Sequence, residues 1–445
     1  LRGGVNQNDN PVEVQQNEAS DAWNVLFTHP KAFGSVMSRD GESTIIAAPQ
    51  ANRVLMLHPY IPLNSANKRL TAVIGTKLYT SSTATPTAWD AGNGAFSTNN
   101  RFSVVQFLDN AYLTNGVEAP QKYSFDGTTV TLGAMDVDAR FTKAKYLAVY
   151  KDRCFALNTY EGTAWQPHRL WWSDTLDFTT WQATSFADIF PSDGWEGSGL
   201  FAYDDSLFIF KEHSLYRLTG ADPSNWNIEE VSKTIGTLSH WSIAAAEKTM
   251  FWHDAYGLYR LDSAMGKPVN ITDYRVRYFM DVLRPNASAS TGIVLPAYQQ
   301  YLLFSPYSGA TNDKVLVYHF NLDAITFFDT LAINVATIYP VTAGDVRFYG
   351  GEYDGDLIQL YKDGTNPTVT VRFATPWYGS KDFQTVAWRQ AMAHLGWVSN
   401  YNLTVTPEFN YGATAQPAVT VAVVQNTENT TDVGASTINS FDYNI

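Results

Sequence analysis

The sequence GLFAYDDSLFIFKEHSLYRLTG, residues 199–220, contains three short apolar runs separated by two polar turns. The runs are residues 200–203, 207–210 and 215–218. Runs of four residues that are rich in aromatic side chains and bounded by turn formers predict strands, not helices. Asp204, Asp205 and Ser206 mark the first turn, because short polar side chains bond to their own backbone.

The second run is apolar on both faces, so the strand that it predicts must be covered on both sides, as in stacked sheets. A fourth run, WNIEEV at residues 226–231, follows the third. Together the four runs predict a four-stranded antiparallel meander.

Hairpins of the same kind recur along the chain. They are TAVIGTKLYTSS (71–82), SVVQFLDNAYLTNG (103–116), YLAVYKDRCFALN (146–158), LFAYDDSLFIFK (200–211), SIAAAEKTMFWHD (242–254), IVLPAYQQYLLFSP (293–306) and TIYPVTAGDVRFYGG (337–351). Successive turns, at Thr76, Asp109, Asp152, Asp205, Lys248, Gln299 and Gly344, are 33, 43, 53, 43, 51 and 45 residues apart. Four-stranded propeller blades need about 40 to 50 residues each, so the spacing predicts a β-propeller.

The second halves of the units agree with this interpretation. QKYSF and TTVTL flank the turn Asp126-Gly127, which is a strong hairpin signal. HSLYRL (213–218) and YGLYRL (256–261) are the best internal match in the chain.

We therefore expect an all-β protein with a β-propeller of about seven four-stranded blades over residues 39–365, with six or eight blades left open. The last blade lacks an obvious fourth strand, so the ring would close by borrowing residues 43–48 or 54–57.

The two ends of the chain differ from the repeat. Residues 1–38 predict an extended N-terminal arm, with one short helix near residues 18–25. Residues 366–445 predict a small C-terminal β-sheet or sandwich extension and a polar tail. Its expected strands are residues 369–373, 403–406 and 419–424, while residues 388–395 could form a helical turn or a strand.

Composition limits the function classes. The 445 residues include 30 Lys and Arg against 43 Asp and Glu, a net charge of −13. Such a chain is not built to grip nucleic-acid phosphate. Solubility is the favoured explanation of the acidic charge, although the charge would also suit a surface that DNA slides past. The one cysteine, Cys154, excludes an internal disulfide, and its apolar run favours a buried inert thiol. No apolar run approaches a membrane span, so we expect no membrane insertion.

No motif for enzymatic chemistry is present. The sequence lacks G-x-S-x-G, G-x-x-x-x-G-K-[ST] and H-E-x-x-H. We therefore expect no enzyme activity, and no catalytic, cofactor-binding or metal-ligating residues. The histidines are scattered, at positions 29, 58, 168, 213, 240, 253, 319 and 394. His213, His253 and His319 occupy similar places in their units, but turn or surface histidines are the favoured interpretation.

Calcium binding by Asp-rich turns is conceivable at Asp9, Asp126, Asp354 and Asp356, but no twelve-residue loop of alternating oxygen ligands accompanies them. The adjacent carboxylates Asp204 and Asp205, and likewise Glu229 and Glu230, are expected to be turn and surface features.

A carbohydrate-binding or glycoside-cleaving propeller used for host-surface recognition is the alternative function. Sialidase-type propellers repeat the turn S-x-D-x-G-x-T-W, and the best candidate is SDTLDFTTW at 173–181. Leu176 stands where Asp belongs and Phe178 where Gly belongs, so the motif fails. The 13 Trp, 25 Tyr and 25 Phe could stack on sugars, but filling the space between wedge-shaped blades is the favoured interpretation.

Several segments together resemble a known family. The N-terminal GGVNQNDNPVEVQQNEASDAWNV resembles the opening of bacteriophage tail structural proteins. KDRCFALNTYEGTAWQPHRLWWSDTLDFTTW (151–181) is similar to their K-D-R, W-x-S and T-x-W unit, and FIFKEHSLYRLTG (208–220) and IGTLSHWSIAAAEKTMFWHDAYGLYRL (235–261) follow in the same order. The resemblance is to β-propeller tail-stabilisation, tail-nozzle and tail-hub proteins. It covers about residues 1–270 in detail and departs after residue 366.

The resemblance implies a non-enzymatic virion protein of the tail. Such a protein would form a homo-oligomeric ring, commonly a hexamer, that extends the tail tube and contacts neighbouring adaptor and fibre proteins. DNA would pass transiently through an acidic lumen during ejection. The N-terminal arm and the polar C-terminal tail would be contact segments that become ordered on assembly.

Overall fold

The computed structural model describes residues 3–9, 14–15, 17–27, 37–96, 100–246, 248–362 and 371–374, and short strands between residues 394 and 437. Contacts divide the chain into two compact units. The first holds residues 1–8 and 15–374, and the second holds residues 9–14 and 375–445.

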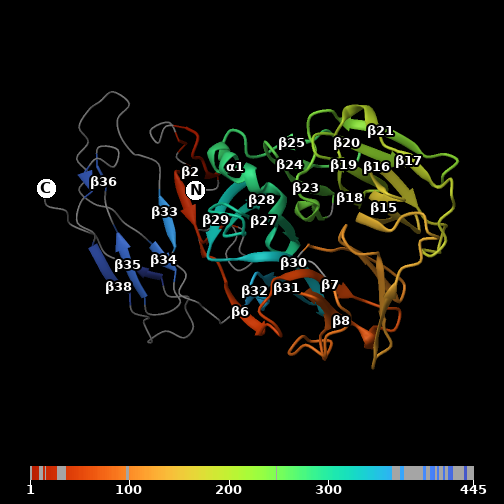
Figure 1. The fold of residues 1–445 in the computed structure, drawn as a ribbon. Coiled ribbons are helices and arrows are strands. Elements are labelled where there is room, and N and C mark those ends of the chain that lie inside the picture. The colour runs from red at the N-terminus through yellow and green to blue at the C-terminus, as the bar shows by residue number, and fades with distance from the viewer. Residues whose placement is uncertain are drawn as a thin grey trace. The chain divides into compact units, whose positions relative to one another are not determined.

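Seven sheets within the described part of the first unit form a β-propeller (Figure 1). The first blade contains β7 (Val54–Tyr60), β8 (Arg69–Ile74) and β9 (Lys77–Thr80); the second contains β10 (Ser103–Phe107), β11 (Asn110–Thr114), β12 (Gln121–Phe125) and β13 (Val130–Ala134); and the third contains β14 (Lys143–Tyr150), β15 (Arg153–Glu161), β16 (Ala164–Trp172) and β17 (Phe186–Asp188). The fourth blade contains β18 (Gly197–Tyr203), β19 (Ser206–Lys211), β20 (Leu215–Thr219) and β21 (Asn227–Ser232), and the fifth contains β22 (Ala244–Ala246), β23 (Thr249–Asp254), β24 (Gly257–Leu261) and β25 (Val269–Asn270). The sixth blade contains β26 (Thr291–Leu295), β27 (Gln300–Ser305), β28 (Lys314–His319) and β29 (Ala324–Asp329), and the seventh contains β30 (Ile333–Thr342), β31 (Asp345–Glu352), β32 (Leu357–Lys362) and β6 (Gly41–Ile46).

The first strand of each blade lies innermost. Neighbouring first strands contact one another around the ring, β10 with β14, β14 with β18, β26 with β30 and β30 with β7. The expected seven blades are therefore confirmed. The fourth blade is the meander of residues 199–220 and its continuation, and every residue of its second strand β19 is buried, as its two apolar faces predict.

The irregular turn spacing has a structural cause in two blades. Thr76 lies between the second and third strands of the first blade, whereas the other turns join first and second strands, so the first gap is short. The gap after Asp152 is long because β15 and β16 each contain nine residues and a loop follows them.

Turn residues in the left-handed backbone region join the strands. Asp204 and Asp205 have φ of 46° and 58°, and Lys151 and Asp152 have φ of 47° and 56°. Consecutive left-handed residues make a two-residue hairpin turn whose twist matches that of the flanking strands. Asp tolerates this region better than most residues do, so the Asp-rich turns of the sequence have a local physical reason.

Aromatic side chains fill the space between neighbouring blades, as expected. Between the third and fourth blades, Phe155 and Trp172 pack with Leu200 and Ile209, and Trp226 meets Trp172 edge to face with 4.8 Å between ring centroids.

The ring closes through a strand from the N-terminal side. β6 pairs antiparallel with β32, with Thr44 opposite Ile358, and supplies the outer strand of the seventh blade (Figure 1). This confirms the first of the two expected closures. The second, at residues 54–57, is wrong, because β7 is the innermost strand of the first blade.

The first blade has three strands in place of the expected four. The segment after β9 makes two isolated bridges, Leu78 with Asn93 and Ser81 with Trp89, and covers the edge without forming a regular strand.

The N-terminal arm packs against the sixth blade. β3 (Asp21–Trp23) runs parallel to β29, and β33 (Arg372–Ala374) pairs on its other side, so this sheet has six strands. The other described strands of the arm are β1 (Gly4–Val5), β2 (Glu18–Ala19), β4 (Val25–Leu26) and β5 (Met37–Ser38).

The helix expected near residues 18–25 is wrong. Ala19, Ala22 and Val25 are all buried in one core cluster, and this three-residue spacing imitates a helical face. Bends at Ser20 and at Asn24, whose φ is 58°, separate three short strands instead. The one α-helix of the described residues is α1 (Arg277–Leu283), which precedes the sixth blade.

In the second unit, the elements that the structure describes are short strands. β35 (Tyr401–Val405) pairs antiparallel with β38 (Val419–Val423), which confirms the strands expected at residues 403–406 and 419–424. The remaining ones are β34 (His394–Gly396), β36 (Glu408–Phe409), β37 (Thr414–Ala415) and β39 (Ala435–Thr437). Residues 388–393 and the other parts of the expected tail lie outside the described residues.

Candidate functional site

Side chains bridge the central channel of the propeller. Arg101, just before the inner strand of the second blade, donates hydrogen bonds to Thr291 Oγ1 at 2.8 Å and to the carbonyl oxygens of Ser288 and Ser290. These acceptors lie at the start of the sixth blade. Because blades two and six are not neighbours in the ring, the bonds run across the channel.

An aromatic stack completes this bridge. Trp241 lies under the Arg101 guanidinium at 4.0 Å and donates from Nε1 to the carbonyl of Phe102 at 3.3 Å. His240 packs between Trp241 and Tyr146, with ring centroids 5.6 and 5.0 Å away. We call Arg101, Tyr146, His240 and Trp241 the channel plug.

The channel plug carries one positive charge at neutral pH. Burial lowers the pKa of Arg101 to about 10, so it stays a cation at neutral pH, while burial lowers the pKa of His240 to about 4 and keeps it neutral. Backbone carbonyls and the Trp241 ring take the place of a carboxylate partner for Arg101.

Residues of the plug line two cavities, Tyr146 the first, and His240 and Trp241 the second. Along β14, Lys145 and Tyr146 face one cavity and Leu147 and Val149 face the other. The second cavity, of about 340 Å³, is lined by the inner strands of the first four blades and by His240 and Trp241.

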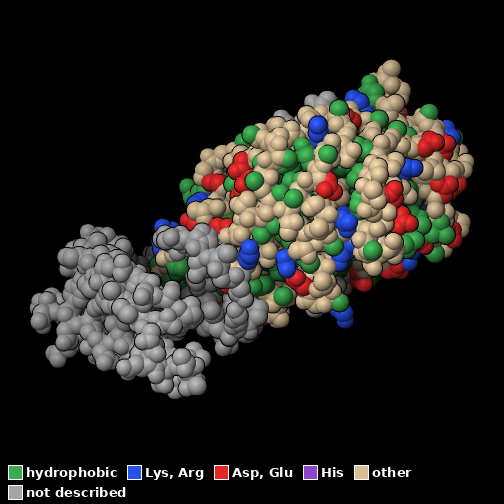
Figure 2. Space-filling model, turned by 90° about the horizontal axis from the view of Figure 1, so that it is seen from below, with side chains coloured by type: hydrophobic (Ala, Val, Ile, Leu, Met, Phe, Trp, Pro, Cys, Tyr) green, Lys and Arg blue, Asp and Glu red, His purple; other side chains and the backbone are tan. Residues whose placement is uncertain are grey.

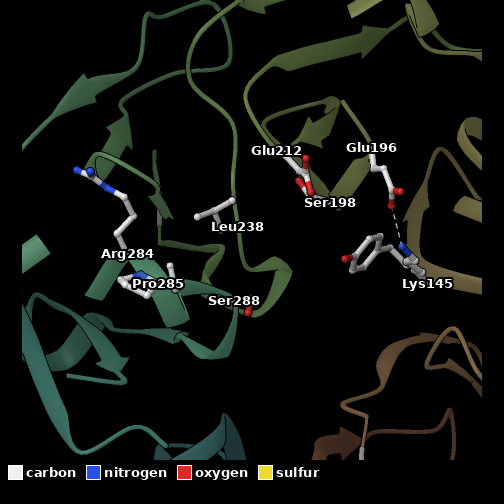
Figure 3. A pocket seen from close by; sticks show the side chains of 11 residues that line it. Lys145, Glu196, Ser198, Glu212, Leu238, Arg284, Pro285 and Ser288 are labelled. Carbon is white, nitrogen blue, oxygen red and sulfur yellow. Dashed lines mark hydrogen bonds and ion pairs between the residues drawn. The ribbon is translucent and has the colours of Figure 1, made fainter. Parts of the chain in front are cut away.

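The first cavity, of about 280 Å³, lies where the inner strands begin, and we call it the mouth pocket (Figure 3). Its polar residues are Lys145, Tyr146, Glu196, Ser198, Glu212, Arg284 and Ser288. Lys145 Nζ bonds Glu196 at 3.0 Å, and this bond holds the pKa of Glu196 below its usual value. Leu238, Pro285 and Ala287 form an apolar wall.

A separate group of carboxylates lies in the β31–β32 turn of the seventh blade. Glu352, Asp354 and Asp356 each place an oxygen within 4.8 Å of the others, and they are the one such group found in the described residues that could hold a metal ion. Burial, and then Asp354 and Asp356, raise the pKa of Glu352 to about 7.

The other Asp-rich turns expected as conceivable calcium ligands do not join this group. Asp126 accepts hydrogen bonds from the backbone N–H groups of Thr128 and Thr129 at 2.8 and 2.7 Å, so it is a turn residue. Asp9 lies in the N-terminal arm.

Among the residues that the structure describes, the histidine side chains do not gather into one group. His253 and His319 are buried, so a surface or turn position for them is wrong. His253 Nδ1 lies 3.1 Å from Ser290 Oγ, and His319 Nε2 lies 2.9 Å from Thr326 Oγ1. His213 is in the β19–β20 turn, with its ring 4.2 Å from that of Trp195. His29 lies outside the described residues.

The adjacent carboxylates are turn and surface features, as expected. Asp204 accepts from the Ala264 N–H at 3.2 Å, and Asp205 pairs with Lys151. On the outer strand β21, Glu229 pairs with Arg217 and Glu230 lies 3.8 Å from Lys233.

Cys154 and the failed sialidase-type turn have structural roles. Cys154 is buried, and burial raises the pKa of its thiol well above the usual value, as expected of an inert side chain. In the turn, Asp177 accepts hydrogen bonds from Thr179 and Thr180, while Phe178 and Trp181 are buried in the core.

The mouth pocket and the plug were missed in the sequence. Their residues come from five blades and share no spacing, and Arg101 and Tyr146 belong to no motif. One local signal was present, the polar SHWS at 239–242 where the other units begin an apolar inner strand.

In the described residues, no helix is long and apolar enough to cross a membrane. The sequence matches no family model and no curated protein.

Three solved structures serve as examples of the likeness. The WD40 domain of Pan2 from Neurospora crassa is 7% identical over 74% of this chain and 98% of its own, with a TM-score of 0.47. PorZ, a surface component of the type-IX secretion system of Porphyromonas gingivalis, is 12% identical over 86% of this chain and 46% of its own, with a TM-score of 0.42. The computationally designed Ika8 protein is 6% identical over 72% of this chain and 99% of its own, with a TM-score of 0.41. Such likenesses concern the fold and leave function open.

Proposed function

We propose that this chain is a non-enzymatic structural protein of a bacteriophage tail, located in the virion, whose copies assemble into a nozzle or hub ring. The observation that carries the proposal is the resemblance of residues 1–270, in which the N-terminal arm, the K-D-R to T-x-W unit and the two following segments occur in the family's order.

The bridged channel supports an assembly in which DNA passes between subunits. Arg101 and Trp241 join opposite sides of the propeller, so a single chain offers no open path along its own axis. A ring of several copies supplies a separate lumen. A hexamer is the stoichiometry that the resemblance favours.

Charge also fits contact with passing DNA. The net charge of −13 repels phosphate, which lowers nonspecific binding. The face in Figure 2 carries both Asp or Glu and Lys or Arg side chains. The excess of acidic groups would therefore have to gather on another surface in order to line a lumen.

Electron microscopy of the purified full chain, together with light scattering, tests the proposal. We expect closed rings with a mass near six chains and no retention of duplex DNA at physiological salt. A chain that stays monomeric at high concentration and joins no tail particle would contradict it. Glycoside hydrolysis in a substrate screen would overturn the non-enzymatic part and favour the carbohydrate-directed alternative.

A further inference from the structure

The charges that face the mouth pocket sum to one negative charge. Lys145 and Glu196 form an ion pair, and Glu212 adds a second carboxylate. Arg284 also lines the pocket, but its guanidinium turns away from Glu212 and Ser198 in Figure 3. It donates from Nε to the Ala255 carbonyl at 2.9 Å and pairs with Asp281.

Glu212 is the carboxylate left for a ligand. Among the described residues no hydrogen bond or ion pair reaches its side chain, although its backbone N–H bonds the Glu196 carbonyl at 3.2 Å. Tyr146, Glu196 and Glu212 line this same cavity of about 280 Å³. Burial raises the pKa of Tyr146 to about 12, which keeps that hydroxyl neutral.

Ser198 supplies an unsatisfied polar atom. The residue is 7% exposed and lines the pocket, and its buried Oγ has no hydrogen-bond partner in the described part of the chain. A buried hydroxyl without a partner costs free energy, and a ligand that bonds to it recovers that cost.

Acceptors therefore outnumber free donors in the pocket. The carboxylate of Glu212 and the hydroxyls of Ser198 and Tyr146 can accept, while the positive charge of Lys145 is already partnered by Glu196. Opposite these groups lies the apolar wall of Leu238, Pro285 and Ala287, which suits the methylene stem of a long side chain.

We propose that the mouth pocket binds a single ammonium or guanidinium group carried on an aliphatic stem, as in a lysine or arginine side chain. Glu212 pairs with the cation, Ser198 and Tyr146 accept its remaining hydrogen bonds, and the apolar wall packs against the stem. The volume of about 280 Å³ is close to the lower limit of about 300 Å³ for small-molecule pockets, so one such group fills it. The binding would occur in the isolated full chain, whether or not it assembles into a ring.

Calorimetric titration of the full chain with N-acetyl-arginine amide and N-acetyl-lysine amide tests this binding. We expect saturable binding of at least one of them, and no binding of glucose, a neutral polyol. Glu212→Gln should weaken binding by about 10-fold or more, because it replaces a charge-assisted hydrogen bond with a neutral one. Ser198→Ala should weaken it by about 3-fold, since a neutral hydrogen bond is lost.

Glu230→Gln is the matched control. It makes the same chemical change on the outer strand of the same blade, and its one described ion pair is the exposed contact with Lys233. Binding should be unchanged in this variant. The proposal fails if neither cation binds, if glucose binds as well as the cations do, or if Glu212→Gln and Glu230→Gln behave alike while both remain folded.

Spermidine separates the two sources of such a cation. If spermidine binds more tightly than the blocked amino acids, then the ligand is a free polyamine. If the blocked amino acids bind more tightly, then it is a basic side chain of a partner protein. Either result requires the same response to Glu212→Gln.

Discussion

The outer edges of the first and sixth blades are covered in different ways. Each has an outer edge whose backbone N–H and C=O groups need partners. The first blade stops at three strands, and a loop covers its edge through two isolated bridges. The sixth blade gains two strands beyond its fourth, β3 from the N-terminal arm and β33 from beyond the ring. An exposed edge is a template for unwanted pairing, so both solutions protect it.

The difference teaches that the arm is part of the core. Val5, Ala19, Ala22 and Val25 are buried with Phe327 in one cluster, and Phe27 packs on His319 with ring centroids 5.5 Å apart. The loop over the first blade contributes fewer core side chains, the half-buried Trp89 beside Tyr79 and the buried Phe96 beside Phe102. We therefore expect the sixth blade to depend on its cover far more than the first does.

Deletion of residues 1–27 should produce the largest effect. It removes β3 and uncovers the sixth blade, and the loss of several buried apolar side chains should cost more than about 5 kcal/mol. Chemical denaturation monitored by tryptophan fluorescence measures this loss. A chain that lacks only residues 1–2 is the control. If the deleted protein unfolds at nearly the same denaturant concentration, then the arm is not part of the core.

Single tryptophan substitutions compare the two covers directly. Trp23 stacks on Phe327 at 5.0 Å and also contacts Lys314 and Arg372, whereas Trp89 contacts Tyr79 at 6.4 Å. Trp23→Ala should lower the free energy of unfolding by about 3 kcal/mol, and Trp89→Ala by about 1 kcal/mol. Equal losses of unfolding free energy in the two variants would contradict the expected difference between the covers of the first and sixth blades.

Acid should destabilise the sixth blade through His319. Burial lowers the pKa of His319 to about 3, so the folded state holds it neutral while the unfolded chain, with a pKa of 6.5, binds a proton. Stability is therefore present above pH 6.5 and is lost as pH falls toward 3, by about 2 kcal/mol at pH 5. Chemical denaturation of the wild type and of His319→Gln at pH 5 and pH 7.5 measures this change. Between pH 7.5 and pH 5, the variant should lose less free energy of unfolding than the wild type does.

His58 of the first blade is the comparison. Burial lowers its pKa to about 4, and its ring is half-buried and bonds Gln106 at 3.2 Å. At pH 5 the two pKa values predict nearly the same acid loss, so the comparison is made near pH 3.5, where His58→Gln should relieve less of that loss than His319→Gln does. A larger relief from His58→Gln would show that the arm does not shield the sixth blade more strongly.

The seventh blade, which lies between the two, should show the smallest effect, with the opposite sign. The pKa of Glu352 is raised to about 7, so its contribution to stability is present below the unfolded value of 4.5 and is lost as pH rises through 7. Because the side chain keeps solvent contact, Glu352→Gln should stabilise the protein by only about 1 kcal/mol at pH 8 and by less at pH 5. The same gain at both pH values would contradict this.

The blade repeat could be predicted because its signals are local. In residues 199–220 the apolar runs alternate with Asp-rich turns, and Asp204 and Asp205 take up the left-handed backbone that those turns need. The closing strand β6 was predicted as one of two options, since a ring with an incomplete last blade must borrow a strand.

The short strands within the arm and the mouth pocket could not be predicted, for two physical reasons. Ala19, Ala22 and Val25 follow a helical spacing, and only contact with β29 turns them into strands. Arg101 and Glu212 acquire their roles from groups on other blades, so no pattern of neighbouring residues in the sequence indicates these roles.

The partners of the N-terminal strands lie very far along the chain. Asn24 bonds Asp329 across 305 residues, and the Ala48 N–H bonds Asp356 across 308. Ribosomes add about 5 to 20 residues per second, so the first strands wait for roughly 15 to 60 s before their partners exist. During synthesis the middle blades can form in order from local hairpins, before the partner strands of β3 and β6 exist. Completion of the ring is therefore a late event, set by how fast the seventh blade is made.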